Sequence, residues 1–464
     1  MKPKLSLLLV ACCAPLAQAA ALDLPERHGS FWLQTDGLPG QPVPASRQAD
    51  ALRFDSLAAL TEYALRERPE SRAAWLGIQA EAARLDAASA ANWPTLSGQL
   101  GFTQSRALSS SGATAPTLHR YGPSLGLAYV IYDFGARAAS IDAQRYQLIA
   151  ALLNSNRALQ DTVAEVETAY FMVLAARAQQ AAQAEQEAAL RASFDAVELR
   201  VRGGLAARAD QLRARAALSE ATLARQLAER DIAKAEAMLK QAAGIEQTRG
   251  LLLDWETTPP PALDAATLLA ELLAEAEQQR PDLRALQAAA ASARTEAERA
   301  RAARWPSLSL AASGGRTYFL EDERTPSTTY SVGVNLSVPL FDGGRLAAQA
   351  RAAERDAERL QAEAESQRSQ VALAVTAAYH DVRHAQDQRE GVALQFDSAS
   401  ESAQAAEARY RAGVGSLLEW LTAQADLARA RQAQAQADSD WLAAFSRLNH
   451  ALGRLPAITP ERTP

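Results

Sequence analysis

Two histidines, His380 and His384, lie four residues apart beside Asp381 in a stretch of helix-forming residues. That spacing places both imidazoles on one helix face, where they could hold a metal ion. The other histidines are isolated along the chain: His28, His119 and His450. Because no third ligand is evident, a solvated helix face is the simpler interpretation, and we expect no metal and no other cofactor.

The sequence gives little support for an enzyme or for a nucleic-acid-binding protein. The two cysteines, Cys12 and Cys13, both lie in an apolar leader. The sequence contains no phosphate loop, dinucleotide fingerprint or serine-elbow motif, so we expect no enzyme. The formal net charge is −6, and no basic run interleaves with aromatic residues, which argues against nucleic acid as a partner.

Two carboxylates stand out by position. Asp210 and Glu419 each follow a glycine-containing turn between two helical stretches, at 202–210 and 411–419. Glycine suits the positive φ that ends many helices, and a carboxylate in the first turn of the next helix suits its dipole. Ordinary helix capping is therefore the alternative explanation for the placement of these two carboxylates.

These turns recur because the chain is internally duplicated. The pairs Arg68-Pro69 and Trp93-Pro94 recur 212 residues later. Tyr170 and Gly204 recur 209 residues later. A chance match would not hold its register over so many points, so two repeats of one plan are expected.

Each repeat predicts the same order of elements. A short helix (57–91, 268–303) is interrupted by its Arg-Pro pair, because proline cannot continue a running helix. Two strands follow in each half, at about 94–107 and 121–133, then 306–320 and 328–341. A long helix (137–202, 345–411) and a returning helix complete the repeat. About 65 helical residues span roughly 100 Å, more than a globular domain needs.

The strands alternate between an apolar and a small polar face. Leu96, Leu100 and Phe102 share one side, whereas Ser97 and Gln99 share the other. Strands of about 10 residues with this pattern cross a bilayer when tilted. One chain supplies four of them, and membrane barrels need at least about 8, so the barrel must be shared between chains. A dimer would give 8 strands and a trimer 12.

The long helices carry a narrow apolar seam of the coiled-coil kind. Its members step by fours, threes and sevens: Leu148, Leu152, Leu159, Val163, Val166, Tyr170 and Val173, then Val371, Val375, Ala378 and Val382. Beyond the leader no apolar run is long enough for a membrane-spanning helix.

The Trp-Pro strand entries, the Tyr132-Asp133-Phe134-Gly135 segment, the segment 338–344 (Val-Pro-Leu-Phe-Asp-Gly-Gly) and the duplicated order resemble the TolC-like outer-membrane factor family over about 52–455. The resemblance implies a mainly α fold with a small transmembrane β part. It implies a homotrimer whose 12-stranded β-barrel in outer-membrane lipid continues into a 12-helix α-barrel. It also implies two partners, a periplasmic adaptor protein and an inner-membrane transporter.

The same resemblance assigns roles at the helix turns. Asp210 matches the family's tip acid in the first half, and Tyr410 and Glu419 match the constriction tyrosine and the first gate acid. Where the family can carry a second inward acid, this sequence has Thr422, so the cation-selective ring is expected to be weaker. The turn residues expected to meet the adaptor are Arg202, Gly203, Gly204, Arg208, Arg411, Gly413 and Gly415.

The expected organisation is a signal peptide (1–19), an extended arm (20–51), a first repeat (52–244), a linker (245–264), a second repeat (265–455) and a tail (456–464). Cys12 also fits a lipoprotein box and is the alternative lipidation site. The expected function is the outer-membrane duct of an efflux pump for small molecules. A type I protein secretion duct and a periplasmic coiled-coil scaffold are the alternatives.

Overall fold

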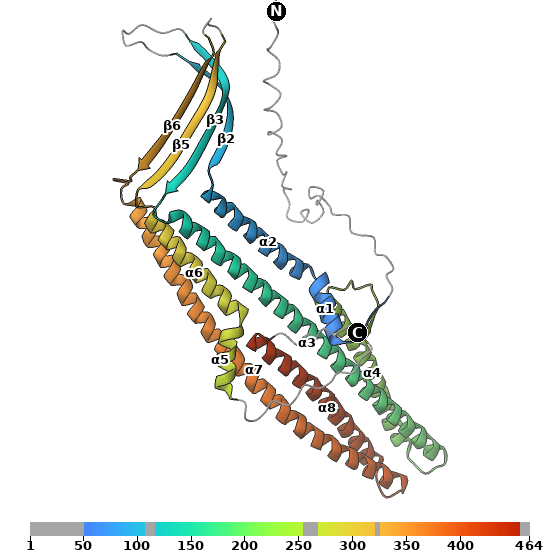
Figure 1. Cartoon of the computed structure of the whole chain (residues 1–464). Coiled ribbons are helices and arrows are strands. Elements are labelled where there is room, and N and C mark those ends of the chain that lie inside the picture. Colours follow the sequence, from blue (N-terminus) through green and yellow to red (C-terminus); the bar gives the residue numbers. More distant parts are fainter. Residues whose placement is uncertain (1–50, 107–116, 254–267, 321–324, 455–464) are drawn as a thin grey trace, which may run out of the picture. The chain divides into compact units, whose positions relative to one another are not determined.

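The computed structural model describes residues 51–106, 117–253, 268–320 and 325–454 (Figure 1). The predicted signal peptide, Cys12, nearly all of the arm and the tail fall outside these residues. So does the linker from residue 254 onward.

The described chain is mainly helical and repeats one strand–strand–long-helix unit, as predicted. The first unit consists of α1 (Leu57–Glu67), α2 (Pro69–Ser89), the short 3₁₀ helix η2 (Ala90–Asn92), β2 (Thr95–Ser105), β3 (Leu118–Tyr132), α3 (Ala136–Arg202) and α4 (Arg208–Ala242). The second consists of α5 (Leu269–Gln279), α6 (Pro281–Ala302), β5 (Ser307–Phe319), β6 (Ser327–Ser337), α7 (Arg345–Arg411) and α8 (Leu417–Leu452). Helices α3 and α7 each contain 67 residues.

The last predicted strand extends too far. We expected it to reach residue 341, but β6 ends at Ser337. Pro339 follows two residues later and has no N–H to donate to a sheet. Conversely, β3 begins at Leu118, three residues before its predicted start.

The Arg-Pro breaks pack against the glycines that end the returning helices. Pro69 and Pro281 occupy the first turns of α2 and α6, where a missing N–H costs nothing. Gly244, after α4, approaches Arg68, and Gly453, after α8, approaches Arg280. A Cβ on Gly453 would lie 3.1 Å from Cα of Arg280. The recurring Arg-Pro and terminal glycine are therefore two sides of one contact.

A second, two-stranded sheet was not predicted. Strand β1 (Leu52–Phe54) pairs in parallel with β4 (Leu251–Leu253), and Leu52 lies opposite Leu251. Phe54 packs on Tyr63 of α1 with ring centroids 5.4 Å apart. The pairing ties the start of the first unit to the segment that follows its last helix.

The long helices pack in two successive arrangements. Near the sheet the neighbours run α2–α3–α6–α7, and beyond it they run α4–α3–α8–α7 (Figure 1). In the second arrangement Val163, Val166, Tyr170 and Val173 of the predicted seam are buried, as are the four predicted members on α7. Leu152, nearer the sheet, is 41% exposed, so that part of the seam is not covered by its own chain. None of the described helices has the length and apolar character to cross a bilayer.

The main sheet has the order β2–β3–β5–β6, with antiparallel neighbours. The register places apolar side chains opposite one another, such as Leu96 with Leu127 and Leu308 with Leu336. The opposite face carries small polar groups, and the Ser313 and Ser331 hydroxyls lie 2.9 Å apart there. The two faces predicted from the alternation are therefore real faces of one sheet.

The apolar face of this sheet is uncovered in the single chain. Leu100 is 81% exposed, Val332 is 72% exposed and Tyr330 is 86% exposed. The terminal strands β2 and β6 each have one neighbour among the described strands. An open sheet edge and an exposed apolar face of this size require a further apolar environment and further strands.

A turn that contains an aspartate connects the second strand of each repeat to the long helix that follows. The Asp133 carboxylate accepts from the Arg137 amide at 2.8 Å, and Asp342 accepts from Leu346 at 2.7 Å. Gly135 and Gly344 adopt φ values of 88° and 85°, which an L side chain rarely adopts. The sheet therefore lies at one end of α3 and α7, and the helix turns lie at the other.

Candidate functional site

The turns α3–α4 and α7–α8, here called the tip, are built alike. The Gly204 amide donates to the Val201 carbonyl at 3.1 Å, and Leu205 donates to Arg200 at 2.8 Å. In the second turn Gly413 donates to Tyr410 at 3.1 Å, and Val414 donates to Arg409 at 3.0 Å. Gly204 and Gly413 have φ values of 72° and 78°. These are Schellman endings, which satisfy the last helix carbonyls and reverse the chain.

The predicted docking residues lie on these turns, and most are exposed. The exposed members are Arg202, Gly203, Gly204, Arg208, Arg411 and Gly413. Gly415 is half-buried, and a Cβ there would lie 3.0 Å from Cβ of Arg409, so a larger residue would force the turn to shift. Leu205 and Val414 are 82% and 71% exposed, which adds apolar surface between the cations.

The two acids take part in local contacts. Glu419 forms a capping box, in which its amide donates to Ser416 Oγ at 3.1 Å and its carboxylate accepts from the Ser416 amide at 3.3 Å. Its carboxylate also lies 4.0 Å from Arg409. Asp210, which is partly buried, lies 3.5 Å from Arg213 on its own helix. Thr422 is exposed one turn beyond Glu419.

Tyr410 lies in a buried cluster with Trp420, Val197, Ala214 and Leu417. Its ring stacks on Trp420 with centroids 5.1 Å apart. The guanidinium of Arg200 lies 4.7 Å from the centre of the same ring. Among the described residues, no hydrogen bond joins Tyr410 to either acid of the tip.

Arg200 and Trp420 were not identified from the sequence. Arg200 occupies the position that Arg409 holds in the second repeat. The sequence pattern alone predicts that both are solvated arginines near the end of a helix. Their different surroundings depend on how the two helical hairpins face each other, which periodicity does not specify.

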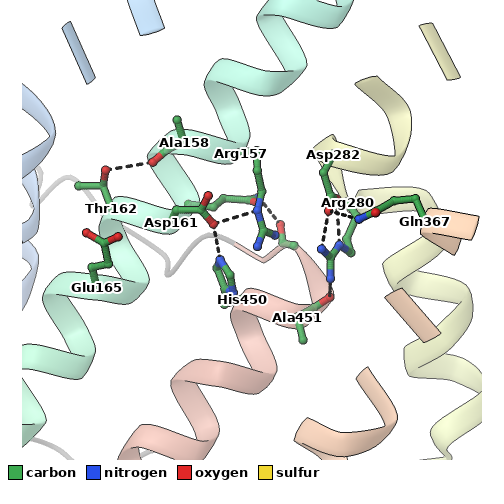
Figure 2. A network of polar contacts seen from close by, with 12 residues as sticks. Arg157, Ala158, Asp161, Thr162, Glu165, Arg280, Asp282, Gln367, His450 and Ala451 are labelled. Carbon is green, nitrogen blue, oxygen red and sulfur yellow. Dashed lines mark hydrogen bonds and ion pairs between the residues drawn. The ribbon is translucent and has the colours of Figure 1, made fainter. Parts of the chain in front are cut away.

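A second polar group, the equatorial network, joins α3 to the end of α8 (Figure 2). His450 Nε2 lies 2.6 Å from Asp161, and Arg157 reaches the same carboxylate at 2.9 Å. Arg280 donates to the Ala451 carbonyl at 3.2 Å. His450, predicted to be isolated, is therefore paired in space, because a neighbour distant in sequence lies opposite it.

Burial shifts the pKa of two members of this network. It lowers the pKa of His450, although the Asp161 hydrogen bond acts to raise it. Burial also lowers the pKa of the Arg157 guanidinium. On the same seam, burial raises the pKa of Glu167, and the hydrogen bond from Ser446 opposes this. Among the described residues, no cluster of His, Cys, Asp or Glu could hold a metal ion.

The family description "Outer membrane efflux protein" matches residues 60–245 and 272–454, one stretch in each repeat. The chain belongs to this family. It is therefore an outer-membrane efflux channel with a periplasmic extension, and members of this family are channels rather than enzymes.

Individual relatives agree with this placement. The chain is 31% identical to Protein CyaE of Bordetella pertussis over 86% of both chains. It is 26% identical to the pyoverdine export outer membrane protein OpmQ of Pseudomonas putida, over 97% of this chain and 96% of that one. The solved structure of CusC superposes with a TM-score of 0.76 at 22% identity, covering 89% of this chain and 96% of that one. At that identity the likeness shows the shared fold.

Proposed function

We propose that the protein is the exit duct of a tripartite efflux pump, which passes small molecules from an inner-membrane transporter and a periplasmic adaptor across the outer membrane. The main sheet is the observation that carries this proposal. Its apolar face is uncovered, and each terminal strand has a neighbour on one side only among the described strands. Lipid would cover the apolar face, and further copies of the chain would pair with the edges.

A homotrimer satisfies both requirements. Three copies bring β2 of one protomer beside β6 of the next and give 12 strands. The same operation places α7 of one protomer beside α2 of the next near the sheet, because these are the outer helices of that layer. The part of the seam around Leu152 would then lie within reach of another protomer. The number three comes from the family resemblance, because a dimer would also pair these edge strands.

The tip would form the periplasmic gate. Three copies of Asp210 and Glu419 would place carboxylates around the mouth and favour cations. Thr422 is neutral, so one ring of charge is weaker than it could be. Tyr410 would constrict the opening from its buried stack on Trp420. The exposed turn residues, with Leu205 and Val414 between the cations, offer the surface for the adaptor.

We favour small-molecule cargo because a similar protein, OpmQ, is named for pyoverdine export. Expression of the protein in a strain that lacks its own outer-membrane duct distinguishes small-molecule efflux from type I protein secretion. Restored resistance to toxic small compounds supports efflux, whereas restored release of a polypeptide supports secretion.

The channel itself is tested on purified protein in detergent. We expect a trimer by mass that inserts into a planar bilayer and conducts poorly. Replacing Asp210 and Glu419 by alanine should raise the single-channel conductance. A monomer that stays soluble without detergent and never conducts would leave only a periplasmic scaffold.

A further inference from the structure

A small pocket of about 240 Å³, here called the aromatic pocket, opens between α3, α7 and α8. Its α3 wall consists of Ala189, Ala192 and Ala196, which share one helix face and present only methyl groups. The wall from α7 and α8 contains the rings of Tyr410 and Trp420, which stack with centroids 5.1 Å apart. Because a drug-sized ligand needs a pocket of about 300–1,000 Å³, this one suits a molecule with a single ring.

Two buried polar side chains of the aromatic pocket have no hydrogen-bond partner among the described residues. Gln424 lines the pocket and is 8% exposed, and its side-chain amide takes part in none of their hydrogen bonds. Trp420 is 6% exposed, and its indole Nε1 has no acceptor among the same residues. Buried polar groups of folded proteins are nearly always hydrogen-bonded. A bound molecule that supplies both partners would therefore be stabilised in this pocket.

The charged groups around the aromatic pocket favour an anion. The guanidinium of Arg200 lies 4.7 Å from the centre of the Tyr410 ring. Arg411 also lines the pocket and forms an ion pair with Glu407, so the wall carries two cations and one carboxylate. Guanidinium and indole N–H groups donate hydrogen bonds but cannot accept them. The ligand must therefore bring acceptors and negative charge, and a carboxylate supplies both.

The internal repeat indicates one such pocket per chain. In the first half, the positions of the two aromatic residues are occupied by Val201 and Gln211. On α7, the middle alanine of the α3 wall is replaced by Glu401. A groove built from these equivalent positions would lack the aromatic wall and would repel an anion.

We propose that the aromatic pocket binds a small aromatic carboxylate, one molecule per chain. The ring of the ligand packs between the α3 alanines and the aromatic pair. Its carboxylate accepts from Trp420 Nε1, from the Gln424 amide and from a guanidinium of the wall. The ligand enters from water past Ala192 and Ala196, which are exposed. This site lies in the wall of the protein and does not depend on which cargo the duct carries.

The test is isothermal titration calorimetry of the purified full-length mature protein in detergent, with sodium benzoate as the probe. We expect saturable binding with one benzoate per chain. Benzamide keeps the ring but has no charge, so its Kd should be at least about tenfold higher than that of benzoate.

Two variants test the residues that hold the carboxylate. Trp420→Phe keeps an aromatic ring and removes the indole N–H, so the Kd for benzoate should rise about tenfold. Gln424→Glu places a second carboxylate beside that of the ligand and should abolish saturable binding. Trp441→Phe is the matched control, because Trp441 lies on the same helix, is 4% exposed and has an Nε1 without an acceptor among the described residues, but does not line the pocket. Its variant should bind benzoate as the wild type does.

Three results would overturn the proposal: no saturable binding of benzoate by the wild type, equal binding of benzoate and benzamide, or unchanged binding in both Trp420→Phe and Gln424→Glu. If one of these variants fails to assemble, the other decides. If neither assembles, the comparison of benzoate with benzamide on the wild type decides. Calorimetry measures binding without conductance, so this site can fail while the channel stands, and the reverse also holds.

Discussion

Replacing Gly453 by alanine probes the contact that ends each returning helix. Gly453 has a φ of 77°, and an added Cβ would lie 3.1 Å from Arg280 Cα and 3.2 Å from its Cγ. Arg280 cannot easily move, because Asp282 and the Ala451 carbonyl hold its guanidinium. An L residue with a side chain, held in the left-handed region of φ, lowers the free energy of unfolding by about 1–2 kcal/mol. Overpacking adds about 1–3 kcal/mol, for a total of about 2–5 kcal/mol.

Two other glycines supply matched controls. Gly413 ends α7 with nearly the same φ, 78°, but no atom lies within 4 Å of its added Cβ. Its alanine variant should lose only the backbone cost, about 1–2 kcal/mol. Gly244 has a φ of 70°, and its added Cβ would lie 3.1 Å from Arg68 Cγ but 3.4 Å from the nearest backbone atom, Arg68 Cα, so the backbone contact is looser than at Gly453. We therefore expect the order Gly453, Gly244, Gly413.

Hydrogen exchange of each purified variant measures these costs locally, at the helix end that carries the change. The extra penalty at Gly453, about 1–3 kcal/mol, corresponds to roughly 5- to 150-fold faster exchange than in the Gly413 variant. Equal acceleration at the two helix ends would refute the packing argument, since backbone strain alone would then explain both.

Three further outcomes are expected. His450 has a folded pKa below its unfolded value, so its contribution to stability is present above about pH 6.5 and is lost as pH falls through the folded pKa. Thermal unfolding of His450→Gln should therefore depend less on pH between about 7 and 5, and an unchanged pH dependence would count against this. Tyr170 is 1% exposed, and alanine there should cost about 3–5 kcal/mol in denaturant unfolding. Leu100→Arg, on the apolar face, should make the free energy of insertion into vesicles about 2–4 kcal/mol less favourable. Gln99→Arg, on the opposite face, should insert nearly as the wild type does.

Most of the fold was predictable because its signals are local and repeated. Alternation such as that of Leu96 to Phe102 defines a strand, and the seam around Tyr170 defines a packed helix. The duplication then gave each prediction a second, independent sample. The limits appeared where a signal was short or ended at a special residue. Strands β1 and β4 have only 3 residues each, and β6 stops before Pro339.

The tip and the equatorial network were only partly predictable. The glycine turns were evident, because positive φ leaves a residue signature. The contacts of Arg200 and His450 were not, since they join residues separated by 210 and 289 positions. Which face of α3 meets α8 depends on packing along their whole length, and no short pattern encodes that rotation.

In the proposed channel, one face of the main sheet meets lipid while the other lines a water-filled pore. Val334 and Asn335 are adjacent on β6 and point to opposite faces, since they lie opposite Leu310 and Ser309. Removal of the predicted leader leaves no cysteine in the chain, so single cysteines at these two positions can be compared directly. A charged, water-soluble thiol reagent applied to trimers in a planar bilayer should reduce conductance through Asn335→Cys and leave Val334→Cys unchanged. Equal reaction at both positions, or reaction at Val334 alone, would mean that the polar face of the sheet does not line the pore.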